Sequence, residues 1–245
     1  MKRLILIFIM FSSLSLMAQT KFGIRGGVNL VNVNEDLGGT EVVDFNGEPI
    51  EITLNQSNRT TFNVGGLIEF WLTPMFALQI NALYNQKGLQ LKGDFSASVI
   101  EQGVPIEISG SEEDQVKLTY LSFPVLAKVA IGKSNVKPYV MAGPEIGFLL
   151  SAKNAVKATA EGEAMGEKFG PITANQEEDI KESFESFEFA INFGAGLTIP
   201  LGRVDLFADG QYSLGLTKIN KESDGGESVK NQVIMIDIGV LFGSN

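Results

Sequence analysis

The sequence predicts an all-β fold, an eight-stranded antiparallel up-and-down β-barrel. Two observations predict it. Apolar side chains recur at every second position in eight segments, and the connections between these segments alternate between long and short. Successive side chains of a strand point to opposite faces, so each segment has one apolar face and one mostly polar face. The alternation of connection lengths is the more specific signal, because a soluble sandwich has no reason to gather its long loops at one end.

The alternation is clearest in two neighbouring segments, 187–199 and 204–214. In the first, the apolar face begins with Phe187, Phe189 and Ile191, and after a break at residues 200–202 the pattern resumes at Val204. Soluble strands are usually about 5–6 residues long. These runs are roughly twice as long, near the 9–11 tilted residues that cross a bilayer. They predict transmembrane strands with the apolar face toward lipid and the polar face toward the lumen.

Six further segments repeat the pattern. In chain order, the eight predicted strands cover residues 21–30, 60–72, 76–85, 116–131, 136–149, 187–199, 204–214 and 231–242. Pro124 lies inside the fourth of them. Proline cannot donate a ladder hydrogen bond, so we expect a bulge at this position.

The connections divide into two classes. The short ones, predicted as periplasmic turns, are residues 73–75, 132–135 and 201–202. The long ones, predicted as extracellular loops, are residues 32–59, 87–115, 151–186 and 217–230. The first long loop contains Asn46-Gly47, a favoured hairpin pair, and the third has a helix-friendly Ala/Glu/Lys composition. An even number of strands lets an antiparallel barrel close without an unpaired edge.

The N-terminus has the pattern of a secretory signal peptide over residues 1–18. Lys2 and Arg3 precede an apolar core that reaches Met17, and Ala18-Gln19 is a suitable cleavage point. A membrane-anchor helix is the weaker alternative, because the apolar run is shorter than the roughly 20 residues that a span needs. The sequence therefore predicts export to the outer membrane and a mature barrel domain over residues 19–245.

Composition narrows the range of functions. A net charge of −10 disfavours nucleic-acid binding, which needs a basic surface. Without cysteine or histidine, the chain lacks thiolate and imidazole chemistry and most transition-metal sites. We therefore expect no enzymatic activity, no cofactor and no catalytic or metal-binding residue. The acidic runs 112–114 and 177–179 could bind Ca²⁺ or Mg²⁺, but they lack the Asp-x-Asp order of a calcium loop and fit a solvated surface better.

The polar faces of the predicted strands carry the candidate site. The charged side chains predicted to face the lumen are Arg25, Glu69, Lys128, Glu145, Glu188, Asp205, Asp209 and Asp237. They could form a charged pore constriction or a proton path. The favoured interpretation is an ion-pair network that fills the interior, because eight strands enclose little more than their own side chains.

Several stretches resemble one known family. These are KFGIRGGVNL at 21–30, YLSFPVLAKV at 120–129, PYVMAGPEIGFLLSA at 138–152 and the closing Leu241-Phe242-Gly243. They resemble the PorT-like outer-membrane β-barrel family, the porin-family proteins of Bacteroidota. The resemblance implies contact with outer-membrane lipid and lipopolysaccharide, and insertion by the barrel-assembly machinery, for which Phe242 resembles the aromatic end signal. The founding member is implicated in protein secretion, a role that does not extend to every relative.

Together these observations predict a non-enzymatic barrel with a largely side-chain-filled lumen. Its role would be structural or interactive, through acidic surface loops that contact an envelope or secretion protein. A narrow passive pore for small solutes is one alternative. A soluble periplasmic lipocalin-like ligand binder is another.

Overall fold

The computed structural model describes residues 19–45, 48–101, 104–132, 136–221 and 228–243. The predicted signal peptide and the Asn46-Gly47 turn lie outside these residues. No helix in the described part of the chain is both long and apolar enough to cross a membrane. The strands are β1 (Gln19–Val33), β2 (Gly39–Phe45), β3 (Glu48–Ser57), β4 (Arg59–Trp71), β5 (Phe76–Glu101), β6 (Val104–Ala130), β7 (Lys137–Ala164), β8 (Glu167–Asp179), β9 (Phe187–Leu201), β10 (Val204–Gly215) and β11 (Asn231–Phe242).

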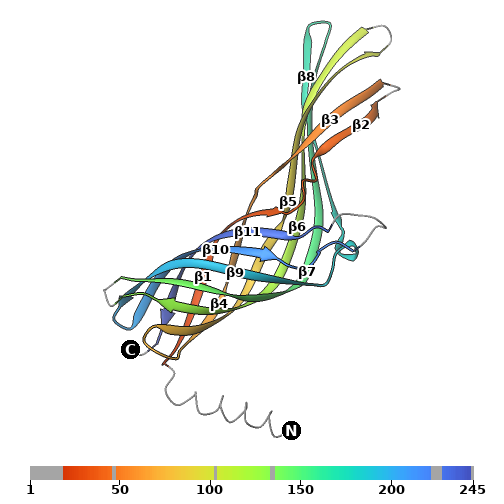
Figure 1. The fold of residues 1–245 in the computed structure, drawn as a ribbon. Coiled ribbons are helices and arrows are strands. Elements are labelled where there is room, and N and C mark those ends of the chain that lie inside the picture. The colour runs from red at the N-terminus through yellow and green to blue at the C-terminus, as the bar shows by residue number, and fades with distance from the viewer. Residues whose placement is uncertain (1–18, 46–47, 102–103, 133–135, 222–227, 244–245) are drawn as a thin grey trace.

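The barrel body in the lower part of Figure 1 is formed by β1, β4, β5, β6, β7, β9, β10 and β11. β1 pairs with β4, the pairing continues through β5, β6, β7, β9 and β10 to β11, and β11 pairs with β1. Every pair is antiparallel, which confirms the predicted all-β antiparallel fold. The two ends of the chain meet along β1 and β11, where Phe22 lies opposite Phe242.

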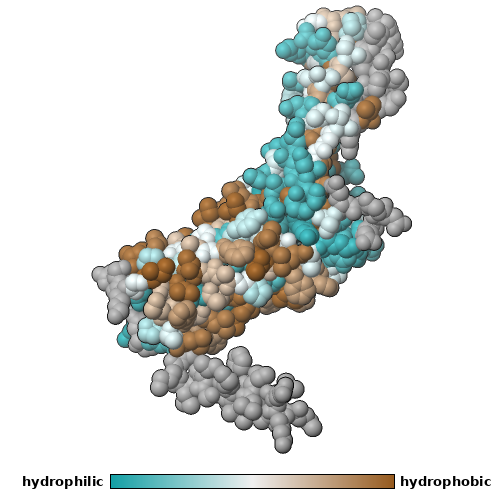
Figure 2. All heavy atoms as spheres, in the orientation of Figure 1, coloured by the Kyte–Doolittle hydropathy of each residue, from teal (hydrophilic) through white to brown (hydrophobic). Residues whose placement is uncertain are grey.

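The outer surface of the barrel body is apolar. Side chains such as Ile24, Ile236 and Ile238 are 61–69% exposed, and aromatic residues such as Phe193 are about half exposed. Figure 2 shows hydrophobic residues spread over the visible face of the barrel body, whereas the upper part of the molecule is mostly hydrophilic. Monomeric soluble proteins rarely expose apolar patches larger than a few hundred Å². The surface therefore suits contact with hydrocarbon.

Strand length agrees with that environment. The strands confined to the barrel body are 12–15 residues long. At about 3.3 Å per residue and a tilt of about 40°, they rise roughly 30–38 Å, close to the thickness of a bilayer core.

Short connections join the strands at one end, which we call the turn end; the opposite end is the loop end. Between β4 and β5, the Thr73 hydroxyl accepts hydrogen bonds from the backbone N–H groups of Met75 and Phe76 at 3.2 and 3.0 Å. Between β9 and β10, Gly202 has φ +76°, a conformation that favours glycine. Residues 133–135 of the remaining short turn lie outside the described residues.

At the loop end, strands continue where loops were predicted, and this corrects the sequence analysis. β5, β6 and β7 are 26, 27 and 28 residues long and extend well beyond the barrel body. With β2, β3 and β8 they form a sheet in the order β2-β3-β5-β6-β7-β8, which rises at the top of Figure 1. We call residues 39–57, 90–115 and 153–179 the projecting sheet.

The prediction of long loops at 87–115 and 151–186 was wrong because the projecting sheet does not rest on a core along most of its length. All residues of β8 are exposed, so its two faces are not distinguished by alternating hydrophobicity. The Ala/Glu/Lys-rich stretch is also not helical. It forms the end of β7 and β8, and the helical element here is the three-residue 3-10 helix Lys181–Ser183. Pairing with neighbouring strands overrides its helix propensity.

The expected bulge at Pro124 is absent as well. β5 and β6 keep one register from the Ile80–Val125 pair to the Leu83–Ser122 pair. The Asn81 side-chain amide donates a hydrogen bond to the Pro124 carbonyl at 3.2 Å. The unchanged register means that β6 has no extra residue relative to β5 at this point. The register shift lies instead between β6 and β7, at Thr119/Tyr120.

The lipid-facing surface can be tested with an outward residue of β11. Ile236→Arg should lower the free energy of unfolding from lipid vesicles by about 2–4 kcal/mol, because a charged side chain would enter hydrocarbon. Val42→Arg is the matched control: Val42 is 63% exposed but belongs to the projecting sheet, so its effect should stay within about 0.5 kcal/mol. Urea titration of both variants measures this, and equal effects would contradict the assignment.

Candidate functional site

The barrel interior contains all eight charged residues that the sequence predicted to face the lumen. Each is buried, with at most 5% of its surface exposed. The alternation of the strands explains this, because a residue two positions from an inward residue also points inward. These side chains form three groups along the barrel, together with cations that the prediction did not include.

The central group surrounds Arg25. Its Nη2 lies 2.9 Å from Asp209 Oδ1 and 2.5 Å from Asp237 Oδ2. The two aspartates lie directly opposite each other on β10 and β11, where like charges repel. Asn63 donates to Asp237 at 2.8 Å, and the Tyr139 hydroxyl donates to Asp209 at 2.9 Å. One guanidinium thus holds two acids that would otherwise repel each other.

A glycine makes room for this group. Gly27 on β1 lies opposite Asp237 on β11. A Cβ atom at Gly27 would come within 2.1 Å of an Asp237 carboxylate oxygen and 2.2 Å of the Ile236 carbonyl oxygen. A larger residue would therefore displace the carboxylate that Arg25 holds.

The second group lies toward the turn end. Lys128 Nζ lies 2.5 Å from Glu69 Oε1, and the Trp71 indole N–H donates to Glu69 Oε2 at 3.0 Å. The Lys128 ammonium also lies 3.8 Å from the centre of the Tyr139 ring, within the range of a cation–π interaction. Nearby, Lys21 Nζ lies 2.5 Å from Asp205 Oδ2.

The third group lies toward the loop end, around Lys87. Its Nζ lies 3.0 Å from Glu145 Oε1 and 3.1 Å from Glu188 Oε2. The side-chain amides of Asn192 and Asn231 donate to the same two glutamates at 2.7 and 3.1 Å. This group repeats the central arrangement of one cation between two acids.

Lys87 and Lys21 are two interior cations that the sequence did not single out as lumen residues. Lys87 lies in the predicted 87–115 loop, because the third predicted strand ends at Asn85, although Asn85 and Lys87 continue the inward pattern of Gln79 and Asn81. Lys21 has the same inward parity as Arg25 in the first predicted strand. With them, the buried charged residues of the described chain are four cations and six acids.

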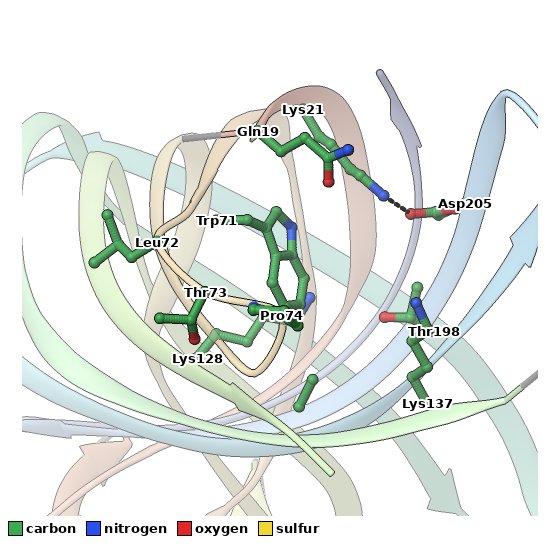
Figure 3. A pocket seen from close by; sticks show the side chains of 11 residues that line it. Gln19, Lys21, Trp71, Leu72, Thr73, Pro74, Lys128, Lys137, Thr198 and Asp205 are labelled. Carbon is green, nitrogen blue, oxygen red and sulfur yellow. Dashed lines mark hydrogen bonds and ion pairs between the residues drawn. The ribbon is translucent and has the colours of Figure 1, made fainter. Parts of the chain in front are cut away.

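A cavity of about 600 Å³ opens at the turn end, next to the second group (Figure 3). Its lining includes Trp71, Lys21, Lys128, Lys137 and Asp205. Trp71 is half-buried and projects into the middle of the view in Figure 3. Trp71 thus faces the interior, as Glu69 two positions before it in β4 does.

The acidic runs of the projecting sheet do not gather into a metal-binding group: among the described residues, no cluster of three or more potential ligands has suitable geometry. Glu177 instead accepts hydrogen bonds from Lys153 at 2.6 Å and Lys117 at 3.4 Å. The hydrogen bond to Glu177 raises the pKa of Lys153, and the hydrogen bond from Lys153 lowers the pKa of Glu177. Glu177 is therefore part of an exposed, partly paired surface.

Residues 17–221 match the family model described as outer membrane protein beta-barrel domain. The chain belongs to this family. Membership agrees with the apolar outer surface and places the protein in the outer membrane. No curated protein matches the sequence.

Solved structures that resemble this outer-membrane barrel domain are themselves outer-membrane or surface proteins. Neisserial surface protein A is 11% identical, with 91% of this chain and 96% of that chain covered and a TM-score of 0.41. OprG from Pseudomonas aeruginosa is 13% identical, with 93% and 98% covered and a TM-score of 0.38. Ail, the attachment invasion locus protein of Yersinia pestis, is 14% identical, with 91% and 99% covered and a TM-score of 0.32. Likenesses at this level say nothing about function.

The central group can be tested by removing its cation. Arg25→Met should lower the free energy of unfolding from lipid vesicles by about 3–5 kcal/mol, because it leaves Asp209 and Asp237 buried without a counter-charge. Urea titration measures the change. The triple variant Arg25→Met, Asp209→Asn, Asp237→Asn should recover part of the loss, and an unaltered single variant would contradict the assigned role.

Proposed function

We propose that this protein is a non-enzymatic, closed eight-stranded outer-membrane barrel that works as a blocked scaffold for its projecting sheet. The observation that supports this most directly is the interior itself. Its charged residues are buried and joined by six ion pairs of 3.1 Å or less. A water-filled channel would leave such side chains solvated.

In this proposal, the eight predicted lumen residues fill the barrel rather than select solutes. Lys87 and Arg25 each bridge two acids from different strands, and Lys128 and Lys21 each hold one. A proton path or ion path would require some of these pairs to open. Opening a buried pair costs several kcal/mol, because it leaves an uncompensated charge in a low-dielectric interior.

The projecting sheet is the surface that we propose for interaction with an envelope or secretion protein. The segments at the loop end, residues 34–59, 88–118, 150–186 and 217–230, carry 23 of the 29 acidic residues and ten of the 19 basic ones. Their net charge of −13 is more negative than that of the whole chain, −10. This negative charge favours a partner with a basic surface, because attraction between opposite charges speeds association. Because paired strands form it, the sheet presents most of that charge in a fixed arrangement.

The proposal also covers the surroundings of the barrel, its insertion and its export. Lipid and lipopolysaccharide surround the apolar barrel body, and the barrel-assembly machinery inserts it. The matching stretches at 21–30, 120–129 and 138–152 favour the PorT-like proteins of Bacteroidota within the family. Residues 1–18 are removed as a signal peptide.

Planar-bilayer recording separates the blocked scaffold from the narrow pore. Folded protein, verified by its altered migration in gels without heating, should give no stepwise current, because ion pairs fill its interior. A general-diffusion porin reconstituted in the same bilayers is the positive control. Stable unitary currents from the folded protein would overturn the proposal in favour of the pore.

Cell fractionation tests the location and the signal peptide together. The protein should remain in the membrane after carbonate extraction, because its apolar surface is in lipid, and Edman sequencing should find an N-terminus at Gln19 or Thr20. Release by carbonate would instead favour the soluble lipocalin-like binder. An intact Met1 would contradict the cleavage but not the barrel.

A further inference from the structure

The turn-end cavity combines four features that point to a ligand. It is partly open to solvent, and its wall contains the Lys21–Asp205 pair and Lys128, whose ammonium is paired with Glu69 behind it. Its volume of about 600 Å³ lies within the usual range of small-molecule sites, about 300–1,000 Å³. It also contains the only tryptophan of the chain.

The charge around this cavity is opposite in sign to that of the loop end. The chain has six acidic residues outside the loop-end segments, and all six are buried in the interior. Lys21 and Lys128 are each paired with one of them. Lys137 is exposed at the rim, and among the described residues it forms no ion pair. A positive charge is therefore available at the mouth of the cavity.

Trp71 supplies a ring face beside these cations. Its indole N–H is fixed by Glu69, which also holds Lys128, so the ring and the Lys128 ammonium keep a defined arrangement. Figure 3 shows Trp71 and Lys128 close together, with Lys137 across the cavity. Indole faces stack on planar rings, and a lysine ammonium pairs with carboxylate or a similar anion.

We propose that the turn-end cavity is a binding site for a small planar anion, such as an aromatic carboxylate, presented from the periplasmic side. The ring of the ligand stacks on Trp71, and its negative charge pairs with Lys137 at the rim. The site is independent of the proposed role of the projecting sheet, and it requires no passage through the barrel.

The single tryptophan provides a direct readout. Folded protein in detergent is titrated with 4-nitrobenzoate, which quenches indole fluorescence, and with its neutral counterpart 4-nitrobenzamide. We expect saturable quenching by the anion and about two- to fivefold weaker binding of the amide, which lacks the charge that pairs with Lys137. Raising the salt concentration should weaken the anion only, because salt screens charge pairing.

Two variants test whether the charge of Lys137 contributes to anion binding. Lys137→Gln should weaken 4-nitrobenzoate binding by about two- to fivefold, the range of one exposed charge pair. Lys153→Gln removes an exposed lysine of the loop end and should leave binding unchanged. Gel migration without heating checks that both variants are folded. Linear, unsaturable quenching that is equal for the anion and the amide would overturn the proposal, and so would unchanged binding in folded Lys137→Gln.

Discussion

Hydrogen bonding of the backbone in hydrocarbon is the constraint on which this structure depends. Lipid offers no partner to a peptide N–H or C=O, so every strand in it needs a neighbour on both sides. The pairing from β1 through β11 and back to β1 supplies those neighbours. Once each strand has two neighbours, its side chains can point only outward to lipid or inward. The apolar surface and the charged interior therefore share one cause.

The inward side chains then have to satisfy one another. Four cations and six acids share the interior with asparagine, tyrosine and tryptophan side chains that donate hydrogen bonds to the acids. Arg25 and Lys87 each bridge two acids, so strands far apart in sequence are linked through single side chains. Small residues such as Gly27 let these groups approach the backbone closely. The same residues that fill the barrel thus also fix how its strands are placed around them.

The sequence was most informative where lipid lies on one side of a strand. Period-two alternation located the strands of the barrel body and the inward position of all eight predicted charges, including Arg25 and Asp237. The period-two alternation did not identify strands beyond the apolar surface of the barrel body. In the projecting sheet both faces of β8 meet water, so composition suggested loops and a helix instead of strands. Lys87 lies just past the end of the third predicted strand, so the sequence did not identify it as an inward residue. The ion-pair partners were not predictable, because parity gives the face of a residue but not its neighbours around the barrel.

The uneven distribution of charge between the two ends has a consequence for assembly. In the proposed orientation both chain ends stay on the periplasmic side, while the segments with a net charge of −13 lie beyond the membrane. All of that charge must be translocated through a layer in which a single ionised side chain costs several kcal/mol. If the interior is blocked as proposed, it offers no route for this charge after β1 and β11 have paired. The hairpins of the projecting sheet would then have to cross the membrane before β1 pairs with β11.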